Sequence, residues 1–374
     1  MLIVAGLGSL VWILILLLPW RPWATKERLD AISDLPESLC DLSDVTVLIP
    51  ARNEASVIAQ TLESLKHQGS SLSVVLVDDN STDETSQVAY GAKLERLKIV
   101  GGQPLPEGWA GKLWALEQGL KQVQTDFVLL MDADITLSPK TIPSLKQLML
   151  RHKVDFLSLM AQLKIDSFWE KLLIPSFIYF FKLLYPFALG NSPERKTAVA
   201  AGGFILTRTK ILREMGGFSI LRDALIDDCS LAKAVKSRGH RTWMGLTHSV
   251  QSHRSYSSLS SIWKMVSRSA FTQLRYSSVL LLLTTAMMLI MFFGPISLGL
   301  ASTSLEWKVV GLIGFMAMLR SYRPTLSFYG LSFFWSLFLP VIGALYLLMT
   351  WSSALNYWLG RKAEWKGRVY SRST

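Results

Sequence analysis

Two aspartates separated by one alanine, Asp132 and Asp134, directly follow the apolar run at residues 127–131. Side chains two residues apart in an extended segment point the same way, so we expect these carboxylates to face one hard cation. Mg²⁺ or Mn²⁺ bound in this way could bridge a diphosphate and neutralise a leaving group. An Asp-x-Asp pattern is common by chance, and its position directly after an apolar run is what makes it a candidate metal site.

Two more polar clusters follow apolar runs earlier in the chain, at residues 50–54 and 78–83. Each has a simpler explanation, because Asn53 and Ser81 could be helix N-caps and Asp78 or Asp83 could favour a turn or a helix dipole. That explanation is harder to apply to three clusters in succession. The repetition predicts one shared binding site.

The segments around these clusters alternate between strand and helix patterns. Apolar and β-branched runs predict strands at residues 45–49, 74–77, 97–100 and 127–131. Helical patterns lie between them, at residues 53–67, in a segment opened by Ser81 or Thr82, and at residues 112–123. Apolar strands that alternate with helices predict an α/β fold with a mostly parallel, buried sheet. Such sheets bind ligands at the carboxyl ends of their strands, which is where the polar clusters fall.

The composition points to a membrane protein with a large water-facing part. The chain has 374 residues, of which 50% are hydrophobic and only 18% charged, against about 25% in a typical soluble domain. This apolar content excludes intrinsic disorder, and two cysteines cannot form a disulfide framework or a four-cysteine zinc site.

Three long runs carry no charge, at residues 2–20, 276–305 and 324–360. We therefore predict an N-terminal transmembrane anchor at 1–20, a water-facing domain at 21–275, a C-terminal transmembrane region at 276–360 and a basic tail at 361–374. A cleaved signal peptide is the alternative for the first run, which lacks a basic segment before it. Either the last run is a hairpin broken near Pro340 and Gly343, or one short C-terminal segment is only interfacial, and we expect two to four C-terminal segments in all.

Charge predicts the orientation. Arg21, Lys26 and Arg28 follow the first run and place the large domain in the cytoplasm by the positive-inside rule. The expected location is the inner membrane, crossed several times. Residues 276–374 hold 8 basic and 2 acidic side chains, so +6 of the total charge of +11 lies beside the predicted spans. That excess suits anionic lipid headgroups, and no nucleic-acid-binding motif accompanies it.

The polar clusters resemble the signature of family 2 glycosyltransferases, which have the GT-A fold. The matching stretches are Ile49-Pro-Ala-Arg-Asn-Glu54, Val77-Asp-Asp-Asn-Ser-Thr-Asp83 and Asp132-Ala-Asp134. A narrower similarity, to the hopene-associated glycosyltransferases, is carried by Gly108-Trp-Ala-Gly-Lys-Leu-Trp-Ala115, Leu183-Leu-Tyr-Pro-Phe187, Ala200-Ala-Gly-Gly203 and Leu225-Ile-Asp-Asp-Cys229. This resemblance covers nearly the whole chain.

The resemblance implies a role for each matching residue. A nucleotide-sugar donor, expected to be a UDP-sugar, would be bound by Pro50, Arg52, Glu54, Asp79, Asp83 and Asp132. Asp132 and Asp134 would coordinate the divalent cation on its diphosphate. Asp228 matches the general base, which implies an inverting single displacement onto an acceptor hydroxyl. A simpler explanation for Asp227 and Asp228 is that they begin a helix and favour its dipole.

Two positions depart from the family pattern. Many membrane members carry Gln-x-x-Arg-Trp in an interfacial helix, whereas this chain has Met265-Val-Ser-Arg-Ser269 and keeps only the arginine. The departure argues against the alternative of a processive polysaccharide synthase. Arg268 could contact the donor diphosphate or a lipid headgroup. Lys112, on a glycine-flanked turn that opens a helix, could reach phosphate or lie on a solvated face.

The aromatic stretch at residues 168–189 is interrupted by Glu170, Lys171, Pro175 and Lys182, which suit a spanning helix poorly. We predict a half-inserted amphipathic segment, with a buried core helix as the alternative. Such a segment would bring the site to the bilayer, so the expected acceptor is a membrane lipid, a hopanoid or a related isoprenoid or carotenoid. The other class that we keep open is a catalytically silent, nucleotide-binding membrane scaffold.

Overall fold

The computed structural model describes residues 2–222, 227–361, 364–365 and 368–369. The chain divides into two compact units. The helical unit comprises Met1–Lys26, Ile165–Ala188 and Tyr256–Lys362, and the α/β unit comprises Glu27–Lys164, Leu189–Ser255 and Ala363–Thr374. All three polar clusters belong to the α/β unit.

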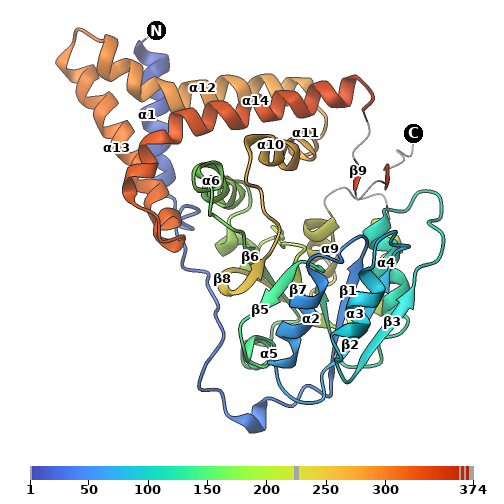
Figure 1. The fold of residues 1–374 in the computed structure, drawn as a ribbon. Helices are drawn as coiled ribbons and strands as arrows, with labels where there is room; N and C mark the ends of the chain where they lie inside the picture. The colour runs from blue at the N-terminus through green and yellow to red at the C-terminus, as the bar shows by residue number, and fades with distance from the viewer. Residues whose placement is uncertain (1, 223–226, 362–363, 366–367, 370–374) are drawn as a thin grey trace. The chain divides into compact units, whose positions relative to one another are not determined.

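An eight-stranded sheet with the order β3-β2-β1-β4-β7-β6-β8-β5 forms the centre of the α/β unit (Figure 1). Its strands are β1 (Val45–Ala51), β2 (Ser73–Asp78), β3 (Leu97–Gly101), β4 (Phe127–Met131), β5 (Ile135–Leu137), β6 (Phe156–Gln162), β7 (Phe204–Arg208) and β8 (Thr242–Ser252). The four strands that the sequence predicts are present. A short antiparallel pair, β9 (Glu364–Trp365) and β10 (Arg368–Val369), is separate from this sheet.

The sheet is mixed, and its first four strands account for most of the parallel pairing. Strand β1 pairs parallel with β2 and β4, so that Leu48 lies opposite Val75 on one side and Leu130 on the other. Strand β7 runs antiparallel between β4 and β6, while β6 and β8 are parallel again. The antiparallel strands come from the second half of the domain, where the sequence predicts no strands.

Both faces of the central strands are buried, which explains why β1, β2 and β4 are apolar without alternation. One face packs against α2 (Ile58–Lys66), α3 (Thr85–Gly91) and α5 (Thr141–His152), and the other against α4 (Gly111–Leu120), α8 (Thr209–Glu214) and α9 (Asp227–Lys236). Helix α4 lies very close to β1. A Cβ atom on Gly119 would come within 2.2 Å of Leu48 Cδ1, so only glycine permits this approach.

Helices α2 and α3 begin later than the sequence predicts. Helix α2 starts at Ile58 rather than at residue 53, and α3 starts at Thr85 rather than at Ser81 or Thr82. The helix caps are Val57 and Glu84, so Asn53 and Ser81 do not serve as N-caps. Their polar groups bond to each other across two loops instead.

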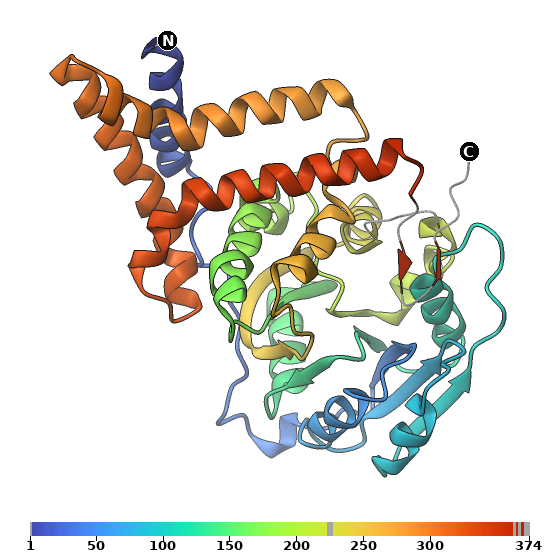
Figure 2. The same cartoon turned by 45° about the horizontal axis from the view of Figure 1, so that its top comes forward.

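The helical unit contains most of the remaining helices (Figure 2). They are α1 (Leu2–Leu17), α6 (Phe168–Leu184), α10 (Leu259–Ser267), α11 (Ala270–Gln273), α12 (Ser278–Ala301), α13 (Leu305–Phe328), η3 (Phe333–Phe338) and α14 (Leu339–Trp358). Three short helices complete the chain: η1 (Glu37–Leu39), α7 (Phe187–Asn191) and η2 (Ser219–Leu221). Helix α1 packs against α12 and α13.

By length and composition, two helical segments of the described chain could cross a membrane, α12 and the segment Phe333–Trp358. Helix α1 is shorter, with 16 residues. The charge-free run at 324–360 is broken at residues 329–338, because α13 continues to Phe328 and α14 begins at Leu339. The break therefore precedes Pro340, and the helix passes through Gly343 without interruption.

Helix α6 occupies the aromatic stretch and begins with a capping box between Ser167 and Glu170. One side of the helix is buried, including Tyr179, whose hydroxyl lies 2.6 Å from Ser321 Oγ. At its two ends Phe168 and Leu184 are exposed. The helix thus has a buried face within its own unit, and its insertion into a bilayer stays a prediction.

Candidate active site

The loops after β1 and β2 are joined by their own hydrogen bonds. Asn53 N donates to Ser81 Oγ at 3.0 Å, and Thr82 N donates to Asn53 Oδ1 at 2.8 Å. Arg52 donates to the backbone carbonyls of Asp79 and Asn80. Asn53 and Asn80 both have φ of 53°, a left-handed conformation that asparagine tolerates better than most residues. The two strand ends therefore form one preshaped rim.

A second set of bonds continues this rim toward α3. Glu54 N donates to Thr85 Oγ1 at 2.8 Å, and Ala55 N donates to Asp83 Oδ2 at 3.1 Å. Partial burial of Asp83 acts to raise its pKa. Hydrogen bonds from Thr85 and from Ala55 N oppose this effect, and the net result is a lowered pKa. Asp83 thus bonds within the protein, and its contact with a donor stays a prediction.

The other residues of this rim differ in their surroundings. Asp78 accepts from Ser81 N at 2.8 Å and from the Ser86 hydroxyl, which is the turn-forming role that the sequence allows. Asp79 is fully buried directly after β2, and Pro50 is buried within β1. Glu54 is also buried, at 8% exposure.

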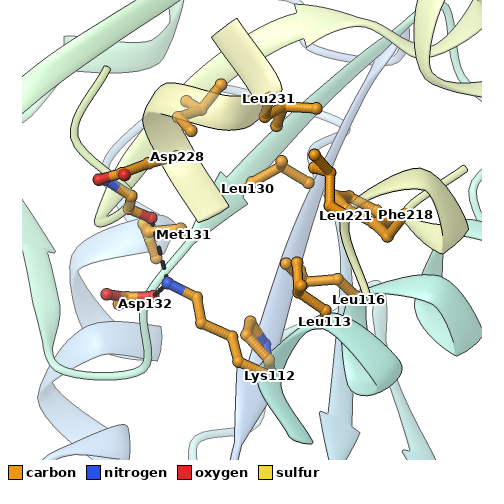
Figure 3. Close-up of a pocket in the computed structure, with 13 residues that line it drawn as sticks. Lys112, Leu113, Leu116, Leu130, Met131, Asp132, Phe218, Leu221, Asp228 and Leu231 are labelled. Atoms are coloured by element: carbon orange, nitrogen blue, oxygen red, sulfur yellow. Dashed lines mark hydrogen bonds and ion pairs between the residues drawn. The ribbon is translucent and has the colours of Figure 1, made fainter. Parts of the chain in front are cut away.

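The two aspartates after β4 lie in a turn that leads into β5, rather than in the extended segment that we expected. Asp132 Oδ1 forms an ion pair with Lys112 Nζ at 2.6 Å (Figure 3). Lys112 is the second residue of α4, as predicted, and its side chain is 20% exposed. It therefore does not lie on a solvated face.

Asp228, at the start of α9, lies near Lys112 through a shared neighbour, Gly202. Its Oδ2 accepts a hydrogen bond from Gly202 N at 2.9 Å, and the carbonyl of Gly202 lies 3.4 Å from Lys112 Nζ. Its Oδ1 accepts from Cys229 N at 2.7 Å, which fits the simpler explanation of a helix-initiating residue as well. The side chain of Asp227 lies outside the described residues.

Lys112, Asp132 and Asp228 line one pocket, which is partly open to solvent (Figure 3). The rest of its lining is apolar, with Leu113, Leu116, Leu130, Met131, Ile205, Phe218, Leu221 and Leu231 among the contributors. A cation and two carboxylates are thus gathered on one side of an apolar pocket. Apolar walls beside these charges lower the local dielectric, so the charges interact more strongly with a ligand than they would in bulk water.

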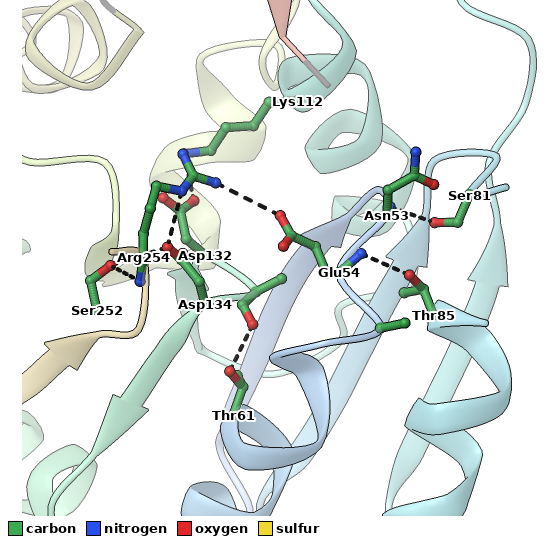
Figure 4. A network of polar contacts seen from close by, with 12 residues as sticks. Asn53, Glu54, Thr61, Ser81, Thr85, Lys112, Asp132, Asp134, Ser252 and Arg254 are labelled. Carbon is green, nitrogen blue, oxygen red and sulfur yellow. Dashed lines mark hydrogen bonds and ion pairs between the residues drawn. The ribbon is translucent and has the colours of Figure 1, made fainter. Parts of the chain in front are cut away.

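Asp134 faces a group that the sequence analysis missed, residues 252–254 at the end of β8 (Figure 4). Its Oδ2 accepts from Ser252 Oγ at 3.1 Å and lies 3.5 Å from Arg254 Nε, and its carbonyl accepts from His253 N. Burial and nearby Lys164 lower the pKa of His253, although Asp134 opposes them. The polar triplet Ser252-His253-Arg254 at the end of this segment is visible in the sequence.

The donor atoms near this turn suit a hard divalent cation. Asp132 is 35% exposed and opens onto the cavity, while Asp134 is mostly buried two residues away. Within the described ranges, no group of three or more His, Cys, Asp or Glu side chains could hold a metal ion alone. A cation held here would complete its coordination with ligand oxygens, as Mg²⁺ commonly does with phosphates. Both residues offer the oxygen ligands that such an ion prefers, and their joint binding of it stays a prediction.

Arg268 is the last residue of the predicted site. It directly follows α10 and is exposed within the helical unit. Its contact with a diphosphate or with a headgroup stays a prediction.

A family model matches the first part of the α/β unit. Residues 46–216 match the model of glycosyl transferase family 2. The match contains the rim, Lys112 and both turn aspartates, and it ends before Asp228 and Arg254.

Named relatives align over parts of the chain. A probable glycosyltransferase of Bacillus subtilis, YdaM, is 34% identical over 139 residues, which cover 34% of this chain and 32% of that protein. A 4,4'-diaponeurosporenoate glycosyltransferase of Staphylococcus aureus is 36% identical over 99 residues, covering 26% and 25% respectively. The chain thus spans about a third or less of these relatives.

A solved structure is similar over almost the whole chain. The mannosyltransferase PcManGT from Pyrobaculum calidifontis, determined in complex with GDP-Man and Mn2+, superposes with a TM-score of 0.55 at 18% identity. The superposition covers 96% of this chain and 100% of the other. Together with the family match it confirms the GT-A fold, here with a mixed sheet.

Proposed function

We propose that the protein transfers a sugar from a nucleotide-sugar donor to a membrane lipid, and the match of residues 46–216 to the model of glycosyl transferase family 2 supports this proposal. One observation carries this proposal: Lys112, Asp132 and Asp228 come from three separate elements and line the same cavity. A lysine beside a metal-binding carboxylate suits a diphosphate, and a further carboxylate suits a proton acceptor. A non-catalytic nucleotide-binding scaffold would not need the second group.

The donor would lie along the preshaped rim and end at the turn after β4. Pro50, Arg52, Glu54, Asp79 and Asp83 would position the base and ribose, because they form or support the rim. Lys112 would bind the diphosphate as a point charge, which is how lysine commonly contacts phosphate. Its distance of 2.6 Å from Asp132 supports this role, since it already lies beside an oxyanion.

Asp132 and Asp134 would hold the divalent cation, Mg²⁺ or Mn²⁺, with His253 close by. When bound, such an ion neutralises charge on the departing diphosphate. The Pyrobaculum mannosyltransferase was solved with both Mn2+ and GDP-Man, which supports a metal-assisted donor site of this kind.

Asp228 would act as the general base. The acceptor hydroxyl loses its proton to the Asp228 carboxylate, its oxygen forms a bond to the anomeric carbon, and the bond from that carbon to the diphosphate oxygen breaks. Attack from the side opposite the leaving group inverts the anomeric centre. The hydrogen bond from Gly202 N holds one carboxylate oxygen of Asp228 in place at 2.9 Å, so the base is oriented before the acceptor arrives.

A lipid acceptor is favoured by the helical unit and by the relatives. Two helical segments are long and apolar enough to cross a membrane, and the staphylococcal relative is named for a carotenoid-like acid. We therefore propose an isoprenoid acceptor, either carotenoid-like or hopanoid. The protein would reside in the inner membrane with its α/β unit in the cytoplasm. Exposed Arg320 and Arg323 on α13 would contact anionic headgroups.

A comparison of lipid extracts tests the proposal. The purified full-length protein is incubated with membrane lipids, Mn²⁺ and a panel of UDP- and GDP-sugars, and products are identified by mass spectrometry. We expect one lipid to gain a hexose, and the same species to disappear from a strain that lacks the gene. Donor binding without transfer or hydrolysis would favour the scaffold instead, and a growing polysaccharide would favour the synthase.

The proposed orientation has its own test. A reporter fused after residue 275 and a protease site near Asp30 should both read as cytoplasmic. A periplasmic signal from either would contradict the positive-inside argument and remove the α/β unit from its nucleotide supply.

A further inference from the structure

Arg254 connects two acidic residues from different strand ends (Figure 4). Its Nε lies 3.5 Å from Asp134 Oδ2, and its Nη2 lies 3.9 Å from Glu54 Oε1. Its backbone N donates to Ser252 Oγ at 3.2 Å, and the same hydroxyl donates to Asp134 Oδ2. The backbone of Arg254 is thus anchored, while its guanidinium contacts both carboxylates at distances longer than a tight ion pair.

Burial explains why a cation is needed there. The side chains of Glu54 and Asp134 are 10% and 11% exposed, whereas that of Arg254 is 38% exposed. Buried carboxylates are costly unless a positive charge compensates them. The guanidinium is the more exposed partner, and it occupies the Asp134 Oδ2 atom at 3.5 Å, where a cation would otherwise bind.

The formal charges of the site suit a divalent cation together with a diphosphate. Glu54, Asp132, Asp134 and Asp228 carry four negative charges, and Lys112 and Arg254 carry two positive ones, so the set has a net charge of −2. A divalent cation would neutralise that set. An incoming diphosphate then adds new negative charge, for which a planar guanidinium is the best-suited partner in the chain.

We infer that Arg254 is a tethered counter-ion: it neutralises Glu54 and Asp134 while no metal is bound, and it turns to the donor diphosphate when the metal takes its place on Asp134. The inference rests on the proposed nucleotide-sugar site. Arg254 is then a positioning and binding residue for the diphosphate. It also competes with the metal whenever the nucleotide is absent.

Loss of the guanidinium should therefore change the affinity for Mn²⁺ and the affinity for nucleotide in opposite directions. Without it, Mn²⁺ alone meets an uncovered Asp134 and should bind more tightly. A nucleoside diphosphate in saturating Mn²⁺ loses a charge-assisted contact and should bind more weakly. A residue that merely stabilised the loop would lower both affinities together.

The test uses the full-length protein in detergent and two variants, Arg254→Gln and the control Arg208→Gln. Arg208 pairs with Asp155 at 3.3 Å on the same sheet and is 42% exposed, which matches Arg254 closely. Binding of Mn²⁺ alone is followed by the electron paramagnetic resonance signal of the free ion. Binding of UDP and of GDP in saturating Mn²⁺ is followed by calorimetry, and no turnover is required.

For Arg254→Gln we expect Mn²⁺ to bind about tenfold more tightly and the nucleotide about tenfold more weakly, since each tenfold step corresponds to one charge-assisted contact of ordinary strength. Arg208→Gln should change neither. Arg254→Lys keeps the charge without the planar fork, so its Mn²⁺ affinity should stay near that of the wild type and its nucleotide affinity should fall between the other two. If Arg254→Gln does not fold, the nucleotide affinity of Arg254→Lys tests the inference in its place.

Two affinities that fall together, or that do not change in either variant, would overturn the inference and leave Arg254 as a loop anchor. Failure of the wild-type protein to bind either nucleotide in Mn²⁺ is a different result. It would contradict the proposed function itself rather than the role of Arg254.

Discussion

The two halves of the sheet edge are built from different kinds of contact. At the ends of β1 and β2, backbone amides, asparagine and hydroxyl groups bond to one another, and Arg52 is bound to backbone carbonyls. After β4, Asp132 pairs with Lys112 at 2.6 Å and Asp134 lies 3.5 Å from Arg254, which follows β8 and also lies 3.9 Å from Glu54. Hydrogen bonds hold the first half together, and partly exposed ion pairs hold the second.

Under the proposed function, this difference would separate donor recognition from the chemical step. The rim is held by hydrogen bonds, which depend on direction, so we expect it to keep one shape whether or not a ligand is bound. Ion pairs near solvent are weaker in net terms, because water and other ions compete for them. Lys112 and Arg254 can therefore exchange a carboxylate for a phosphate at little cost. We expect mutations in the charged half to affect turnover and mutations in the rim to affect stability.

The largest effect should come from the metal carboxylates. Chelation, Asp132→Asn or Asp134→Asn should lower transfer by about 10³-fold or more, since a metal ion supplies several kcal/mol of charge stabilisation. The measurement is the initial rate of sugar transfer at saturating donor, with Mn²⁺ or Mg²⁺ added back after chelation. Asp126→Asn, an exposed residue at the opposite end of β4, is the control. Full activity in excess chelator would remove the metal from the site.

Asp228→Asn should come next. Its loss as a positioned base should lower transfer by about 10²–10⁴-fold, while the affinity for nucleotide changes little because the rim is intact. Transfer rate and nucleotide affinity are measured in parallel for Asp228→Asn and Asp227→Asn. A large loss in Asp227→Asn with near-normal transfer in Asp228→Asn would move the base by one residue. Near-normal transfer in both would exclude this aspartate pair from the chemistry.

Lys112→Gln should have an intermediate effect. Removing a charge-assisted contact worth about 1.5–3 kcal/mol should weaken nucleotide binding by about 10–100-fold. Calorimetry with UDP or GDP in Mn²⁺ measures this change. Lys98→Gln serves as the control, because Lys98 on β3 is exposed and donates to the Gln122 side chain, away from the cavity residues. Unchanged affinity in Lys112→Gln would place the diphosphate away from α4.

Thr85→Val should have the smallest effect on turnover, within about twofold, because it alters only the rim. It removes a hydroxyl that bonds to Asp83 and to Glu54 N, so the free energy of unfolding should fall by about 1 kcal/mol. Thermal and denaturant unfolding measure this loss. A large fall in transfer with normal stability would mean that the rim takes part in the chemistry.

The same variant tests a dependence on pH. Burial opposes the change, but hydrogen bonds from Thr85 and from Ala55 N lower the pKa of Asp83 below its ordinary value of 3.8. A carboxylate whose pKa is lower in the folded state stabilises the protein above the unfolded value, and this contribution is lost as the pH falls through the folded value. The stability gap between wild type and Thr85→Val should therefore be largest near pH 7 and shrink below about pH 4. A constant gap would contradict this account of Asp83.

Local sequence patterns determined the first half of the α/β unit. The strands β1 to β4 fall where apolar runs predict them, because strands buried on both faces must be apolar throughout. The polar clusters at their ends, the position of Lys112 at the start of α4 and the family 2 signature were also readable in this way. The charge-free runs likewise correspond to α1, α12 and α14, since helix-forming apolar stretches need no distant partner to be recognised.

Only the tertiary structure decided which of these residues meet. Lys112 and Asp132 are 20 positions apart, Asp228 takes a backbone amide from Gly202, and Arg254 reaches Glu54 across 200 positions. The antiparallel insertion of β7 and the pairing of β8 with β5 and β6 bring these groups together. Hydrophobic periodicity reports whether a residue is buried but not which strand it pairs with. The neighbours of each charge were therefore set by sheet topology, the one property that no local pattern encodes.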